Sequence, residues 1–232
     1  MKTQPTRPHL VLKAIIVLCS ACVLHGQGTF QNLNFESAVI VPIPGDPFGH
    51  VQFAPAFPGW NATINGQAQT VALYNNFSGS TPSMTLLGPG FPLARYEGNY
   101  TAILQTHTIS LQAQVSLFQT GLVPSDARSL RFLGTTPAGL FQGTLSVSLG
   151  GVPLSLIVLQ DFVTNALYAV DITSFAAQNA ELRFTDTVGP GGSSDFFLDA
   201  ITFSPIAVPE PGTWALLGLG STFFWCAARR RK

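Results

Sequence analysis

The residues best suited to chemistry in the central part of this sequence are carboxylates. Asp195 and Asp199 are four residues apart, and in a β-strand that spacing puts both side chains on one face, where they could hold a metal ion. General acid–base catalysis would instead need two carboxylates with separated pKa values in a shared pocket. The spacing of Asp161, Asp171 and Asp186 indicates no such pair. The carboxylates therefore do not predict a catalytic centre.

No other pattern predicts catalysis. The chain contains no Gly-x-Ser-x-Gly elbow, no phosphate-binding P-loop and no His-Glu-x-x-His motif. His50 and His107 have no ligand-like spacing, and we expect each to be a satisfied or solvated histidine. Cys19, Cys22 and Cys226 all lie near the chain ends, which excludes a disulfide, a zinc thiolate site and a cysteine nucleophile from the central part. We therefore expect no enzyme activity.

Three aromatic residues are candidate sugar contacts. Trp60, Tyr74 and Tyr96 have ring faces of the kind that stack on sugars at concave sites. Core packing is the alternative for Trp60. Charged residues make up only 9% of the chain, against about a quarter in ordinary proteins. The polar surface must therefore be mostly Ser, Thr, Asn and Gln, which hydrogen-bond readily to sugar hydroxyls.

Net charge excludes one class of partner. Residues 27–205 carry four arginines and ten acidic residues, a net charge of −6. The other seven cations lie in the two ends of the chain. A domain that is acidic and poor in cations is unsuited to binding nucleic acid.

Residues 27–205 carry many short alternating runs separated by Gly, Pro and Asn, which is typical of strands. Gly150-Gly151 predicts a tight hairpin, and 174–178 predicts one short helical turn. The predicted strands are 100–105, 109–117, 130–133, 145–149, 152–159, 180–185 and 196–203. This spacing predicts an all-β fold, a jelly-roll-like β-sandwich.

Residues 1–26 are typical of a secretory signal peptide. Basic residues precede the apolar run 14–24, and the small residue Gly26 follows it. The predicted partners are the Sec translocon and signal peptidase. A lipoprotein processed at Cys22 is the alternative.

The tail, 206–232, has three parts in order. Two prolines hold 208–212 extended. Residues 213–228 are uncharged, and as a helix they would span about 24 Å, which predicts a single transmembrane helix. The basic end, Arg229, Arg230, Arg231 and Lys232, is expected to stay on the cytoplasmic side.

These parts, with the motif Val208-Pro209-Glu210-Pro211, resemble the PEP-CTERM sorting tail of exported bacterial proteins. The resemblance implies an exosortase, a membrane transpeptidase, as partner, with cleavage near the motif. It also implies export across the inner membrane, transient anchoring by the tail, and delivery to the envelope, surface or extracellular matrix. A tail that stays uncut as an anchor is the alternative.

Six short segments of residues 27–205 resemble parts of galactose-binding-like jelly rolls and carbohydrate-binding modules. They follow each other in the same order as in that family: 32–36, 58–60, 98–105, 171–175, 181–184 and 197–201. The resemblance implies that 32–36 opens the fold as a strand. It also implies a structural Ca²⁺ held by Glu36 and Asp199, with backbone carbonyls as further ligands. The alternative is that Glu36 is a solvated strand end and Asp199 caps a turn.

Together these features predict an exported envelope or matrix protein with a non-catalytic module that binds glycans, with an exopolysaccharide as a candidate partner. A divergent glycan hydrolase or lyase on the same scaffold is one alternative. A purely structural matrix protein without a ligand is the other.

Overall fold

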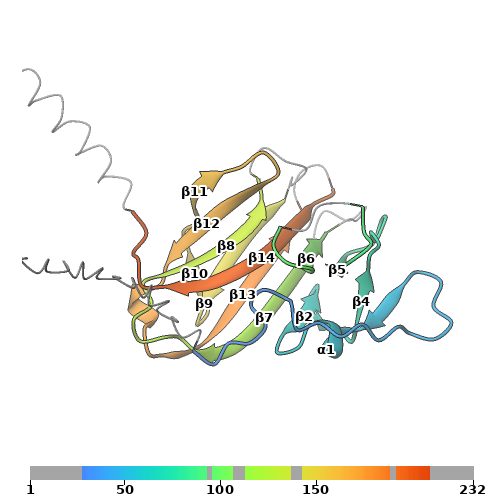
Figure 1. The fold of residues 1–232 in the computed structure, drawn as a ribbon, viewed down its shortest axis with the longest axis horizontal. Coiled ribbons are helices and arrows are strands. Elements are labelled where there is room, and N and C mark those ends of the chain that lie inside the picture. The colour runs from blue at the N-terminus through green and yellow to red at the C-terminus, as the bar shows by residue number, and fades with distance from the viewer. Residues whose placement is uncertain (1–27, 93–95, 107–112, 137–142, 189–191, 210–232) are drawn as a thin grey trace, which may run out of the picture.

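Two β-sheets face each other across one hydrophobic core in the computed structural model (Figure 1), which describes residues 28–92, 96–106, 113–136, 143–188 and 192–209. The eight-stranded sheet has the order β1-β4-β5-β6-β14-β8-β12-β11, and the six-stranded sheet has the order β10-β9-β13-β7-β2-β3. The elements are β1 (His50–Gln52), α1 (Phe53–Ala56), β2 (Asn61–Ile64), β3 (Gln67–Ala68), β4 (Val71–Tyr74), β5 (Ser83–Leu87), β6 (Thr101–Gln105), β7 (Gln114–Leu122), β8 (Ser129–Thr135), β9 (Thr144–Leu149), β10 (Val152–Leu154), β11 (Ile157–Asp161), β12 (Asn165–Asp171), a 3₁₀ turn (Thr173–Phe175), β13 (Asn179–Thr187) and β14 (Asp195–Ser204).

Alternation along the strands builds the core. On β13, Leu182 and Phe184 face inward and are fully buried, while Arg183 and Thr185 lie on the outer face. Phe184 meets Phe132 of the opposite sheet edge-on, with ring centroids 5.2 Å apart. The strand pairs are antiparallel except β4 with β5, which run parallel. The apolar side chains that alternate along the strands therefore form one layer between the two sheets.

The all-β prediction is confirmed, and the facing sheets are consistent with a jelly roll. The glycine hairpin is also confirmed, because Val152 of β10 pairs with Leu149 of β9. The single strand predicted over 152–159 is wrong. The chain leaves the six-stranded sheet after Leu154 and enters the eight-stranded sheet at Ile157, so β10 and β11 belong to different sheets.

The opening strand expected at 32–36 is also wrong, because these residues form turns. Asn32 and Phe35 have positive φ values of 48° and 60°, which an extended strand excludes. The Phe35 amide donates to the Asn32 carbonyl at 3.2 Å. The early strands β1 to β5 and α1, with two to five residues each, escaped prediction because they are short, and the seven-residue β12 was missed as well.

The predicted signal peptide, the span 213–228 and the basic end lie outside the described residues. No helix in the described part of the chain is long and apolar enough to cross a membrane.

One carboxylate faces the interior between the sheets. Asp186 of β13 is fully buried, and its oxygens accept hydrogen bonds from the hydroxyls of Ser194 at 3.1 Å and Thr106 at 3.2 Å. Burial raises the pKa of Asp186 to about 7, although these hydrogen bonds act to lower it. The folded protein therefore binds a proton here that the unfolded chain releases near its usual pKa of 3.8.

This proton makes stability depend on pH. The stabilisation by protonated Asp186 is fully present below the usual pKa of 3.8 and is lost as pH rises through about 7. Asp186→Asn stays neutral, so its free energy of unfolding should fall less between about pH 5 and pH 8 than that of the wild type. Some slope remains, because burial also raises the pKa of Asp199 to about 7.

Urea unfolding at both pH values measures this effect. Asp171→Asn is the control, because hydrogen bonds from Thr173 hold the pKa of Asp171 below its usual value and outside this range. An Asp186→Asn protein with the full wild-type slope would contradict the assignment.

Candidate functional site

The loop between Ile43 and His50 is closed and held by its own polar groups. The Ile43 amide donates to the His50 carbonyl at 3.0 Å, and the Asp46 amide donates to the Ile43 carbonyl at 3.2 Å. Asp46 Oδ2 in turn accepts from the His50 amide at 2.6 Å and from His50 Nδ1 at 2.8 Å. Gly49, with φ of 79°, gives the left-handed turn that returns the chain into β1.

The pair of Asp46 and His50 fixes the hydrogen bonding of the imidazole. The His50 side chain, followed by its amide, holds the pKa of Asp46 below the usual value, so this carboxylate is ionised and can only accept. His50 Nδ1 must therefore carry the proton of this bond. In the neutral ring Nε2 is then an acceptor. The prediction that His50 is a satisfied histidine is confirmed, whereas His107 lies outside the described residues.

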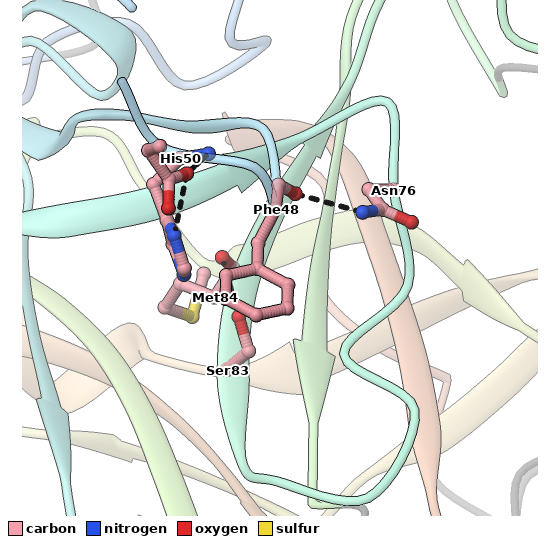
Figure 2. Close-up of polar contacts among 6 residues, drawn as sticks. Phe48, His50, Asn76, Ser83 and Met84 are labelled. Carbon is pink, nitrogen blue, oxygen red and sulfur yellow. Dashed lines mark hydrogen bonds and ion pairs between the residues drawn. The ribbon is translucent and has the colours of Figure 1, made fainter. Parts of the chain in front are cut away.

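Phe48 stands at the tip of this loop. Its side chain is 63% exposed, and its ring lies edge-on to the His50 ring, with centroids 6.1 Å apart. The carbonyl of Phe48 accepts a hydrogen bond of 2.7 Å from Asn76 Nδ2 (Figure 2). Asn76 Oδ1 accepts from the Phe77 amide at 2.9 Å. Asn76 therefore ties the backbone at the tip of this loop to the loop at 75–82.

Phe48 and His50 border a hollow of about 440 Å³ at the β1 end of the eight-stranded sheet. Figure 2 shows them on one side of this space, with Ser83 and Met84 of β5 beside them. The remaining lining residues are Ile64, Gln69, Val71, Ala72, Leu73, Asn76, Phe77, Ser78, Ser80, Thr81 and Pro82. The described lining thus joins apolar and aromatic groups with amides and hydroxyls, and it contains no Asp, Glu, Lys or Arg.

The two acids predicted to bind calcium both accept hydrogen bonds from one turn, 97–101. Glu36 Oε1 accepts from the amides of Asn99 at 2.7 Å and Tyr100 at 2.9 Å, and Oε2 accepts from Asn99 Nδ2 at 3.0 Å. Asp199 Oδ2 accepts from the Glu97 amide at 3.0 Å and the Thr101 hydroxyl at 2.8 Å. Asp199 Oδ1 accepts from the Ala200 amide at 2.7 Å.

This arrangement favours the alternative in which the two carboxylates fix a turn, because each carboxylate oxygen already accepts from an N–H or O–H donor. Within the described ranges, no group of three or more His, Cys, Asp or Glu side chains could hold a metal ion. Asp195 does share the outer face of β14 with Asp199, as its spacing predicts, and it accepts from Gln105 Nε2 at 2.9 Å. Calcium binding stays a prediction.

The three predicted aromatic contacts lie in different parts of the fold. Trp60 is only 4% exposed, packs on Phe35 at 5.8 Å and donates from Nε1 to the Asn32 carbonyl at 3.0 Å. A sugar cannot reach its face, so the core alternative holds for this residue. Half-buried Tyr74 packs against the core from β4.

Tyr96 is half-buried over the outer face of β14, with its ring 5.7 Å from that of Phe197. Its hydroxyl donates to the Thr164 carbonyl at 3.3 Å, and burial raises its pKa to about 12. Neither Tyr74 nor Tyr96 lines the hollow. Their role in glycan binding stays a prediction.

Sequence reasoning missed Phe48, although a signal was present. Phe48 stands between Pro47 and Gly49 in a run of turn residues. A large apolar residue inside a turn has no strand face on which to be buried, so exposure is the expected outcome. For Asn76, whose amide bridges two loops, the sequence carries no comparable signal.

Residues 207–232 match the family model described as the PEP-CTERM protein-sorting motif. The predicted identity of the tail is thereby confirmed, and the motif implies export and exosortase-dependent sorting at the membrane. Val208 and Pro209 are described and follow β14, whereas Glu210, Pro211 and the basic end lie outside the described residues. No curated protein matches the chain.

Three solved structures are similar to the fold. TmCBM61 in complex with β-1,4-galactotriose is 10% identical, with 77% of this chain and 100% of that chain covered and a TM-score of 0.46. The enzymatically active domain of tailspike protein 4 of bacteriophage CBA120 is 16% identical, with 63% and 19% covered and a TM-score of 0.39. The secreted serine protease VesC from Vibrio cholerae is 12% identical, with 74% and 44% covered and a TM-score of 0.28. Likenesses at this level carry no information about the ligand or activity of this chain.

Because donors already occupy the oxygens of Glu36 and Asp199, we expect calcium to leave the melting temperature unchanged. The measurement compares the protein in millimolar Ca²⁺ with the protein in chelator. Binding to the folded state alone would add about 2.7 kcal/mol of stability at a hundredfold excess over Kd. A clear rise with Ca²⁺ that disappears in Glu36→Gln would restore the calcium site.

Proposed function

We propose that this chain is an exported envelope or extracellular-matrix protein whose sandwich binds a neutral glycan in the hollow beside Phe48 and His50, without turning it over. The observation that carries the proposal is the exposed ring of Phe48 at the rim of an uncharged, amphipathic hollow. A pyranose ring has an apolar face of C–H groups and a rim of hydroxyls, and this lining offers a partner to each.

The lining supports a neutral ligand in particular. A charged group would lose its hydration in the hollow and find no opposite charge among the described lining residues. His50 Nε2 can accept a hydrogen bond from a sugar hydroxyl, and the hydroxyls of Ser80 and Thr81 can donate or accept. The volume of about 440 Å³ also falls within the usual range for small-molecule sites, about 300–1,000 Å³.

The site is organised before any ligand arrives. Asp46 holds His50 through two hydrogen bonds, and Asn76 holds the carbonyl of Phe48. Because these loops are already fixed in the free protein, the entropic cost of ordering them on binding is lower. This matters for sugars, whose many hydroxyls are already well hydrated in water.

Hydrolysis by the usual route would need two carboxyl groups about 5 to 10 Å apart flanking the glycosidic bond. The described lining of the hollow contains none. Asp46 is bound to the histidine beside it rather than facing the space as a free acid. These observations support a binding module over the alternative of a hydrolase.

The position of the hollow suits a protein sorted by its tail. Figure 1 shows both described ends of the chain leaving one end of the sandwich, with β1 and β4 at the other end. Near the tail, the Ile206 carbonyl accepts from the Ser129 hydroxyl at 2.7 Å. A protein held by its C-terminus would therefore present the hollow away from the membrane.

Removing the Phe48 ring tests glycan binding. The segment 28–209 contains every strand and the whole described core, and it is screened on an array of neutral oligosaccharides. The best ligand is then titrated by calorimetry. Phe48→Ala should bind about tenfold more weakly, a loss of about 1.4 kcal/mol, because stacking is lost.

Phe162→Ala is the matched control, because Phe162 is 40% exposed but does not line the hollow. Equal losses in both variants, or no binding by the wild type, would favour the purely structural alternative. Sustained release of reducing sugar, abolished by His50→Ala in a folded protein, would favour the enzyme.

Processing of the tail is tested in a host that has an exosortase. The extended motif precedes an uncharged span, so we expect cleavage near Glu210 and no peptide from Trp214 onward in mass spectra of the surface fraction. Replacing Pro209, Glu210 and Pro211 by Ala should leave the protein uncut in the membrane. An intact end at Lys232 in the surface-delivered wild type would support the permanent anchor instead.

A further inference from the structure

The chain stays bound to the sandwich for two residues beyond the last strand. β14 ends at Ser204, which pairs with Ser129 at the start of β8. The Ile206 carbonyl then accepts hydrogen bonds from the Ser129 hydroxyl at 2.7 Å and from Arg131 Nη2 at 3.5 Å. The Ile206 amide donates to the Ser204 hydroxyl at 3.2 Å. Side chains of the sandwich therefore hold both backbone polar groups of Ile206 at the end where the chain leaves (Figure 1).

Ser129 and Arg131 form a clasp on Ile206, and their own contact strengthens it. Ser129 is fully buried, and its hydroxyl accepts from Arg131 Nε at 3.2 Å while it donates to Ile206. A hydroxyl that accepts from a cation donates more strongly, because hydrogen bonds in a chain polarise one another. The Ile206 side chain is 63% exposed. The clasp thus acts on the backbone, and it can open without removing an apolar side chain from the core.

The clasp lies directly before the sorting signal. The match to the PEP-CTERM protein-sorting motif begins at residue 207, which follows Ile206. The uncharged run predicted to enter the membrane begins at Thr213, so only residues 207–212 separate it from the clasp. An extended chain covers at most about 3.3–3.6 Å per residue, so these six residues span about 20 Å. The expected cleavage position near Glu210 is therefore confined between the sandwich and the membrane.

This short stretch is unfavourable for an enzyme that cleaves it. A protease site binds its substrate as an extended segment, whose backbone groups must be available for pairing with the enzyme. With the clasp closed, the sandwich occupies the space on one side of the motif, and the carbonyl of Ile206 is already bound. We propose that the clasp restrains cleavage of the tail, and that its release gives the exosortase the length of chain it needs. This inference rests on the processing near Glu210 proposed above and adds control by the folded domain.

Release of the clasp is an equilibrium that a few hydrogen bonds decide. It would add Pro205 and Ile206 to the stretch, which would grow from six residues to eight, or about 27 Å. Cleavage follows the population of the open form when opening and closing are faster than cleavage. Hydrogen bonds of this kind each shift such a population by about 2- to 10-fold. Removing one of them should therefore change the processing rate measurably.

Pulse-chase labelling of the full chain in a host that has an exosortase tests the clasp. Ser129→Ala removes the shorter hydrogen bond and a partner of Arg131, so the uncut form should disappear about fivefold faster than in the wild type. Arg131→Gln leaves the Ser129 bond in place, and we expect about a twofold increase. Arg183→Gln is the matched control, because Arg183 lies on β13 of the other sheet, where it stacks on Phe118 and pairs with Glu181. It should be processed at the wild-type rate.

Added length should replace release of the clasp. Inserting Gly-Ser-Gly-Ser between Ile206 and Ala207 leaves the clasp and the motif intact and lengthens the stretch by about 14 Å. Processing should then be fast in the wild-type background, and Ser129→Ala should accelerate it no further. An insertion that leaves the rate unchanged would show that length does not limit cleavage and would overturn the proposal.

Comparison of Ser129→Ala with the wild type separates the restraint from processing itself. Equal rates, with both proteins folded as judged by their melting temperatures, would overturn the restraint but leave processing of the tail intact. Slower cleavage of Ser129→Ala would also overturn it, since the clasp would then present the motif to the enzyme. If the wild type stays uncut, cleavage of Ser129→Ala supports the restraint, whereas two uncut proteins would contradict both the restraint and the proposed processing.

Discussion

The fold depends on two carboxylates that hold one turn from opposite ends of the sequence. Glu36 lies in the N-terminal turns and Asp199 in the last strand. Their carboxylates accept hydrogen bonds from the backbone amides of Glu97, Asn99 and Tyr100. Glu97 and Asn99 are exposed, but their turn leads into β6, whose five residues are all buried inside the eight-stranded sheet. Gly98 is required there, because a Cβ would overlap Glu36 Oε1 and its φ is 59°. The N-terminal turns and the last strand are thus fastened to the same turn beside the eight-stranded sheet.

Two of the later strands, β13 and β14, were predicted well because they are long and alternate between two environments, whereas the seven-residue β12 was not predicted. β13 and β14 span nine and ten residues, so their period of two is visible above local variation. The N-terminal half could not be predicted in this way. Strands of two to five residues contain too few alternations to reveal a period, and the turns at Asn32 and Phe35 depend on tertiary contacts such as that of Trp60 with the Asn32 carbonyl.

The candidate site was missed for a related reason. Its side chains come from the loop at 43–50, the strands β4 and β5, and the loop at 76–82, and no sequence motif joins them. The aromatic residues were chosen from the sequence by residue type alone, whereas the exposure of a ring decides whether it can contact a sugar. Trp60 is buried by its neighbours in the core, while Phe48 is exposed at the tip of a loop whose backbone Asn76 binds. Glu36 and Asp199, chosen from the sequence as calcium ligands, both contact the same turn of backbone, and their binding of calcium stays a prediction.

Scarcity of charge explains the character of the hollow. Charged residues make up only 9% of the chain, so this surface relies on hydroxyls, amides and apolar side chains for its contacts. A lining of this kind supports a neutral ligand better than a charged one, because a charged group would lose its hydration there without gaining a partner. The hollow also lies far from the tail: the described C-terminal residues leave one end of the sandwich, and β1 and β4 lie at the other. A protein held by its tail would therefore keep the hollow accessible to a ligand outside the membrane.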